Sequence, residues 1–134
     1  MAPHVTVSVP AQDAERILGA LLDLYAARAA HLAEHVADAS RVHEARAGLA
    51  AVGRMLDLFG WEHGRRARGA DLSGPEGEVG EVLRLALSDA HDALGAAIAA
   101  YHDGHAELED VAAASERLNA MLARFSGFEA DHAL

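Results

Sequence analysis

Apolar residues recur every three or four positions through most of this chain, from Pro10 to Phe125. This spacing places apolar side chains along one face of an α-helix, so it predicts a helical protein. Four segments show the pattern, and the residues of their seams are Leu18, Leu22, Tyr25, Ala29, Leu32 and Val36; Val42, Ala45, Leu49, Val52, Leu56 and Phe59; Leu83, Leu87, Ala90, Leu94, Ala97 and Tyr101; and Leu108, Val111, Ser115, Leu118, Leu122 and Phe125.

The boundaries of the four helices are predicted from breaks in this pattern. Residues 62–74 contain three glycines and little apolar periodicity, so we expect a loop there. Asp103-Gly104 is a turn signal, whereas the first break, at Asp38-Ala39-Ser40, offers only capping residues. The expected helices are 10–37, 40–61, 75–101 and 105–125.

Signals at the ends of the segments refine this prediction. Residues 4–9, HVTVSV, alternate apolar and polar side chains, which indicates a short strand or an extended arm. Residues 73–76, SGPE, match a capping box at the start of the third helix, with Ser73 as the cap. Gly127 is expected to stop the fourth helix, and residues 128–134 are expected to form a mobile tail.

The two halves of the chain resemble each other. Pro10 and Pro75 precede the first and third helices, and the similar stretches MLDLFG (55–60) and MLARFSG (121–127) end the two halves. Each half is therefore expected to form a helical hairpin, and two antiparallel hairpins make a four-helix bundle. We predict one all-α domain, with or without the N-terminal strand or arm, divided into 1–61 (first hairpin), 62–74 (loop), 75–127 (second hairpin) and 128–134 (tail).

Composition narrows the classes of function. The 134 residues include no cysteine, which excludes disulfides and thiolate zinc sites. Eleven arginines and no lysine face 21 acidic residues, and the formal net charge of −10 disfavours binding to nucleic acid. The sequence has no secretory signal pattern and no apolar stretch of the roughly 20 residues that a membrane span requires. We therefore expect a cytoplasmic protein that binds neither nucleic acid nor membrane.

The stretch HLAEH (31–35) is the strongest candidate for a metal site. His31 and His35 lie one helical turn apart, and HxxEH resembles the motif of the inverted zinc proteases, in which the glutamate activates water. That family builds the motif into a much larger α/β domain, so we reject a protease. Helical bundles also bind metals through histidines and carboxylates from several helices, and His105 and Glu109 could complete such a zinc or iron site. The alternative is that these histidines only form hydrogen bonds at helix ends.

Four residues are candidates for binding a partner. Arg65, Arg66 and Arg68, in the basic stretch GRRARG, could hold a phosphate or an acidic partner through paired hydrogen bonds. The alternative is a solvated loop. Trp61 could anchor a partner, because aromatic residues are enriched at interfaces, or it could cover the end of the bundle.

The first helix carries a second seam beside the first, which suggests self-association. Its residues are Ile17, Leu21, Leu24, Arg28, His31 and His35. Together the two seams are broader than one partner helix needs, so we expect a homodimer through the first and third segments. Arg28 is then expected either to reach solvent or to pair with a carboxylate across an interface.

No serine–histidine–aspartate set, phosphate-binding glycine loop or paired-carboxylate spacing is evident in the sequence. We therefore expect a non-catalytic interaction or regulatory module that binds itself and an unidentified protein partner, without a cofactor. Two alternatives stay open. One is a metal-binding bundle, which could be a metal-dependent enzyme, and the other is a small-ligand pocket between the hairpins, floored by Tyr25 and Tyr101.

Overall fold

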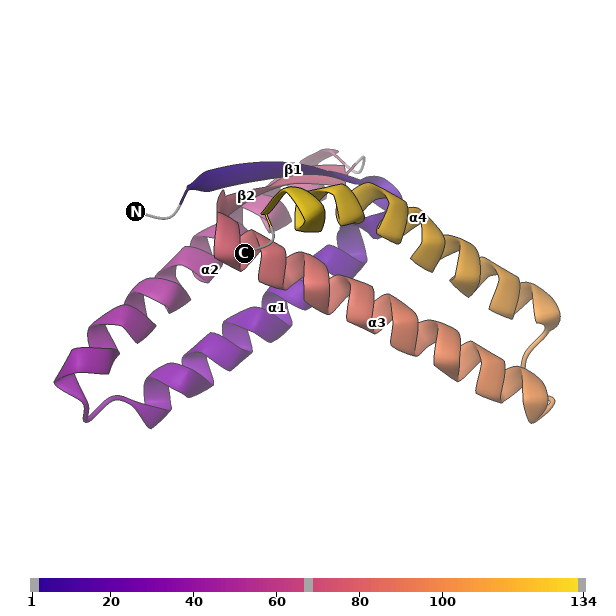
Figure 1. Cartoon of the computed structure of the whole chain (residues 1–134), viewed down its shortest axis with the longest axis horizontal. Helices are drawn as coiled ribbons and strands as arrows, with labels where there is room; N and C mark the ends of the chain where they lie inside the picture. The colour runs from indigo at the N-terminus through magenta and orange to yellow at the C-terminus, as the bar shows by residue number, and fades with distance from the viewer. Residues whose placement is uncertain (1–2, 67–68, 133–134) are drawn as a thin grey trace. The chain divides into compact units, whose positions relative to one another are not determined.

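The protein is mostly helical, with four helices that pack in pairs and two short strands that form an antiparallel sheet (Figure 1). The computed structural model describes residues 3–66 and 69–132, with side chains for residues 3–64 and 69–125. The elements in chain order are β1 (His4–Pro10), α1 (Ala11–Glu34), α2 (Ala39–Arg66), β2 (Gly69–Pro75), α3 (Glu76–His102) and α4 (Leu108–His132). The prediction of four helices and an N-terminal strand is therefore confirmed.

The chain divides into two compact units, Met1–Val82 and Leu83–Leu134, with the boundary inside α3. Unit 1 holds the sheet, α1, α2 and the first turns of α3, and unit 2 holds the rest of α3 and α4. Among the described residues, none of the helices combines the length and the apolar character that crossing a bilayer requires.

Strands β1 and β2 form a two-stranded ribbon in place of the predicted loop. They pair antiparallel from His4 opposite Pro75 to Pro10 opposite Gly69. The prediction of a loop over 62–74 is therefore wrong, because α2 continues to Arg66 and the next described residues are already in β2. Alternation within β2 buries Ala70 and Leu72.

Ser73 does not cap α3. It lies within β2, and its hydroxyl shares a hydrogen bond of 2.9 Å with the Thr6 hydroxyl across the ribbon. The backbone N–H of Glu76, at the start of α3, donates to the Pro3 carbonyl at 2.9 Å. The predicted capping box is therefore wrong, because the extended backbone of the strand turns the serine toward β1 and away from the helix.

The second seam of α1, not the first, forms the core of unit 1. Ile17 and Leu21 are fully buried, whereas Leu22 on the first seam is 52% exposed. The ribbon accounts for this difference, since α1 contacts both strands as well as α2. The first seam lies at the edge of the helix pair, where Tyr25 packs over Gly53 of α2. The prediction that the first seam is the full core is wrong. The chain covers the apolar residues of the second seam, whereas Leu22, Tyr25 and Val36 of the first seam are exposed, so the dimer through the first and third segments stays a prediction.

The inner face of α2, defined here as Val52, Met55 and Phe59, completes this core. All three side chains are buried, which confirms the predicted seam at Val52 and Phe59. Gly74 of β2 lies against this face, because a Cβ atom placed on it would be 2.6 Å from the Met55 sulfur. The glycine thus lets the ribbon approach α2 closely.

In unit 2, buried residues concentrate away from the turn between the two helices. Those on α3 and α4 are Leu83, Ala86, Ala90, Leu118, Met121 and Phe125. Toward the turn, Tyr101 and Leu108 are exposed although both belong to predicted seams. Small alanine side chains dominate the last turns of α3, so little apolar surface is available there to cover them.

The turn between α3 and α4 begins at a glycine. Gly104 has a φ of 78°, and the N–H of His105 donates to the Ala100 carbonyl at 2.8 Å, the pattern of a Schellman cap. Helix α4 therefore begins at Leu108 rather than near His105. At its other end, the predicted stop at Gly127 is wrong, because α4 continues to His132 and residues 128–132 of the predicted tail are helical; residues 133–134 lie outside the described residues.

The ribbon adds an observation that supports the internal repeat. β2 follows β1 at an interval of 65 residues, the same interval that separates Pro10 from Pro75. The pairing is centred on Val7 and Leu72, which are separated by that interval too. Each half of the chain thus has the order strand, helix, helix, and the equivalent strands pair with each other.

Candidate functional site

The outer face of α2, defined here as Arg54, Leu58 and Trp61, carries large side chains that the fold leaves exposed. Leu58 is 61% exposed and Trp61 is 63% exposed. Their spacing of four and three residues places them on one side of the helix, away from the buried inner face. A shallow groove of about 220 Å³ adjoins this face and is lined by His4, Ala51, Arg54, Met55, Leu58, Ser73, Gly74 and Pro75.

Trp61 was predicted either to anchor a partner or to cover the end of the bundle. Because its side chain is mostly exposed, the first interpretation is favoured. Tryptophan offers a large apolar surface together with one N–H donor, which is why it is frequent at interfaces. The three arginines that follow it in the sequence cannot be judged in the same way. Arg65 and Arg66 continue α2, but their side chains, like all of Arg68, lie outside the described residues, so their role stays a prediction.

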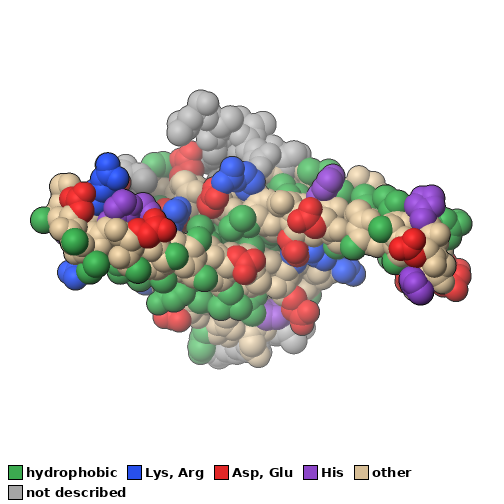
Figure 2. Space-filling view, turned by 90° about the horizontal axis from the view of Figure 1, so that it is seen from below, with side chains coloured by type: hydrophobic (Ala, Val, Ile, Leu, Met, Phe, Trp, Pro, Cys, Tyr) green, Lys and Arg blue, Asp and Glu red, His purple; other side chains and the backbone are tan. Residues whose placement is uncertain are grey.

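A second candidate site lies at the carboxyl end of α1. His31 and Glu34 are in the last turn of the helix, and His35 is its C-cap. One ligand atom from each of the three side chains can be chosen so that all lie within 4.8 Å of one another. The two imidazole rings meet edge to face, with centroids 4.5 Å apart. Figure 2 shows histidine and acidic side chains gathered near this end of the α1–α2 hairpin.

A polar cleft of about 420 Å³ adjoins this cluster and shares His31 with it. The cleft is lined by Arg28, His31, Arg41, Glu44, Ala45, Gly48 and Glu78. Arg28 donates to Glu78 through Nη2 at 2.9 Å and through Nε at 3.3 Å. Arg28 therefore pairs with a carboxylate of its own chain, whereas the predicted pair was one across an interface. Two arginines and two glutamates balance the formal charge of the cleft.

The turn after α1 is held by Asp38. Its carboxylate accepts hydrogen bonds from the Ser40 hydroxyl at 2.7 Å and from the Ser40 backbone N–H at 3.0 Å. These hydrogen bonds lower the pKa of Asp38 below its ordinary value, since they favour the charged form. The confirmed break between the first two helices thus has a capping residue but neither glycine nor proline.

The other predicted metal ligands, His105 and Glu109, belong to unit 2. His105 lies in the turn before α4, and Glu109 lies in the first turn of that helix. His105 and Glu109 were expected to lie one turn apart on the same helix. Because His105 is outside α4, this arrangement is not formed. Their participation in a metal site stays a prediction, as does a ligand pocket between Tyr25 in unit 1 and Tyr101 in unit 2.

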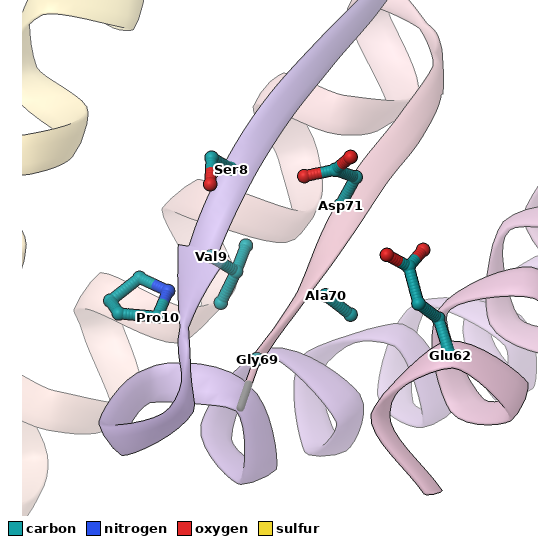
Figure 3. Close-up of a pocket in the computed structure, with 7 residues that line it drawn as sticks. All are labelled: Ser8, Val9, Pro10, Glu62, Gly69, Ala70 and Asp71. Atoms are coloured by element: carbon teal, nitrogen blue, oxygen red, sulfur yellow. The ribbon is translucent and has the colours of Figure 1, made fainter. Parts of the chain in front are cut away.

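A further cleft, of about 480 Å³, lies at the end of the ribbon (Figure 3). Its lining includes the carboxylates of Glu62 and Asp71, and sequence reasoning did not find it because it assigned residues 62–74 to a loop. Gly69 also lines this cleft, and its φ of 112° is a backbone conformation that favours glycine. The two carboxylates suit a positively charged group, but Glu62 already has an interaction within the chain.

Compared with protein-family models, with curated proteins and with solved structures, the chain matches none of them.

Proposed function

We propose that the protein is a non-catalytic interaction module that self-associates through the outer face of α2. The exposure of Leu58 and Trp61, both above 60%, is the observation that carries this proposal. They are adjacent along the helix, so they make one apolar surface rather than two scattered ones. Burying such side chains is worth about 2 kcal/mol each, and central tryptophans dominate the free energy of many interfaces.

The charges flanking Leu58 favour a second copy of this chain as the partner. Arg54 precedes Leu58 by four residues, and Glu62 follows it by four residues. If two copies of α2 cross antiparallel with Leu58 at the centre, Arg54 of each copy lies beside Glu62 of the other, in addition to the interaction that Glu62 makes within its own chain. A two-fold interface uses the same surface on both subunits, and this arrangement of charges is complementary to itself.

The expected dimer is weak. One pair of crossing helices lies at the small end of the range of protein interfaces, so we expect a dissociation constant on the order of 10 μM. The groove beside Leu58 offers room for a side chain of the second copy.

Sedimentation velocity over a range of concentrations tests the proposal. The wild-type protein should change from monomer to dimer, and Trp61→Ala should raise the dissociation constant about thirtyfold, as for a central aromatic anchor. Leu22→Ala is the matched control, because Leu22 is also exposed but lies on α1. A dimer that Leu22→Ala weakens as much as Trp61→Ala does would contradict the proposed interface.

A charge swap tests the geometry more closely. Arg54→Glu and Glu62→Arg should each weaken the dimer about fivefold, because each places like charges opposite one another. The double variant restores opposite charges and should recover the wild-type dissociation constant. If the double variant is weaker than either single variant, the two helices do not cross with Leu58 at the centre.

A further inference from the structure

We infer that His31, Glu34 and His35 form a binding site for a divalent transition metal ion of the zinc class. The site is independent of the proposed dimer interface, since it is built at the carboxyl end of α1 and uses no residue of the outer face of α2. The inference rests on the spacing of the three ligands, their chemistry and the electrostatics of the helix end.

The spacing is close to what a tetrahedral ion needs. Zinc binds histidine nitrogen and carboxylate oxygen at about 2.0 to 2.2 Å, so its ligand atoms lie about 3.3 Å from one another. The three side chains already bring one ligand atom each to within 4.8 Å of the others. His31 and Glu34 are exposed and His35 is half-buried, so small side-chain rotations can close the remaining distance. The helix supplies this arrangement, because residues one turn apart project together.

The chemistry of the donors selects the class of ion. Two imidazoles and one carboxylate suit zinc, nickel, copper or iron, whereas magnesium and calcium prefer sites made wholly of oxygen. Three protein ligands also leave at least one coordination position for water or a small ligand. Because His31 lines the polar cleft, a ligand that enters the cleft comes into contact with this side chain of the site.

The electrostatics of the helix end favour a cation as well. The carboxyl end of a helix carries a partial negative charge from its unpaired carbonyl groups. Asp38 lies in the turn that follows, where its backbone N–H donates to the His35 carbonyl at 3.0 Å, and Arg41 Nε lies 3.6 Å from its carboxylate and partly balances its charge. A divalent ion would therefore neutralise negative charge contributed by Glu34 and the end of α1.

Calorimetric titration with zinc ions, on protein free of affinity tags and chelators, tests the site. The wild-type chain should bind about one zinc ion, and the double variant His31→Ala/His35→Ala should bind it at least thirtyfold more weakly. Glu34→Gln keeps the shape of the side chain but removes its charge, so it should weaken binding about tenfold. Magnesium titrated under the same conditions should give no binding.

The matched control is His91→Ala/His102→Ala, which removes two exposed histidines from α3. It should bind zinc as tightly as the wild type, and so should Trp61→Ala if the site is independent of the dimer. Far-UV circular dichroism without metal should show that every variant is folded, and zinc should raise the melting temperature of the wild type but not of His31→Ala/His35→Ala. Equal loss of zinc binding in both double variants, or no loss in either, would overturn the inference.

Discussion

The two faces of α2 show how the same residue types serve different purposes. On the inner face, Phe59 is fully buried and packs into the core of unit 1. On the outer face, Leu58 immediately before it and Trp61 two residues after it are mostly exposed. Both faces carry large apolar side chains at helical spacing. Because the ribbon, α1 and the start of α3 already complete the core, the fold does not need the outer face. A contiguous apolar surface that stays exposed in the folded chain is typical of a binding site.

The largest expected effect comes from the inner face. Phe59→Ala should reduce the free energy of unfolding by about 3 to 5 kcal/mol, because it leaves a large cavity in the core. Urea unfolding followed by circular dichroism measures the change. A loss below about 1 kcal/mol would mean that the inner face is not the main core contact of α2.

Gly74→Ala should destabilise the protein less, by about 1 to 3 kcal/mol, through overpacking of the same face. Its new methyl group would meet the Met55 side chain, and the flexible thioether can move only in part. Met55→Ala in the same background should recover some of the loss by making room. If the two substitutions were simply additive, the methyl group would not be in contact with Met55.

Trp61→Ala should leave the free energy of unfolding of the monomer within about 0.5 kcal/mol of the wild type, since the side chain is mostly exposed. Unfolding at a concentration well below the dissociation constant is the appropriate measurement. A loss comparable to that of Phe59→Ala would show that Trp61 belongs to the fold, and the distinction between the two faces would fail.

The smallest expected effect comes from Asp38, just before the amino end of α2. Its substitution should alter the pH dependence of stability without changing the inner or the outer face of α2. The folded pKa of Asp38 lies below its ordinary value of 3.8, so its contribution to stability is present above that value and is lost as the pH falls through the folded pKa. Asp38→Asn should therefore flatten the dependence of unfolding free energy on pH below about pH 4, measured by acid titration. If the dependence of unfolding free energy on pH is unchanged in Asp38→Asn, other carboxylates cause the loss of stability in acid.

The sequence predicted local features well and long-range features poorly. Helical spacing was sufficient for the four helices and for the proximity of His31 and His35, since both depend on residues within one turn. It did not predict β2, because a short strand next to a helix end is recognised only with its partner, which lies 65 residues away. Because the ribbon was not predicted, the sequence could not show which of the two seams of α1 is buried.

The same limit applies to the candidate sites. His105 and Glu109 have the spacing of the His31 and His35 pair, but Gly104 ends α3 and places His105 in a turn. For α2, Leu56, Leu58, Phe59 and Trp61 are all apolar, and periodicity alone predicted burial for Leu56 and Phe59 without fixing the environment of Trp61. Its exposure follows from the width of the core, which only the packed structure determines.

The emission spectrum of Trp61, followed against protein concentration, tests the central claim most directly. Trp61 is the only tryptophan of the chain, so the emission reports on the outer face of α2 without any substitution. Between about 1 μM and 100 μM, a range that spans the expected dissociation constant, the maximum should move to shorter wavelength as the mass doubles. If the mass doubles while the emission stays that of a solvated indole, or if the mass does not change at all, self-association through this face is contradicted.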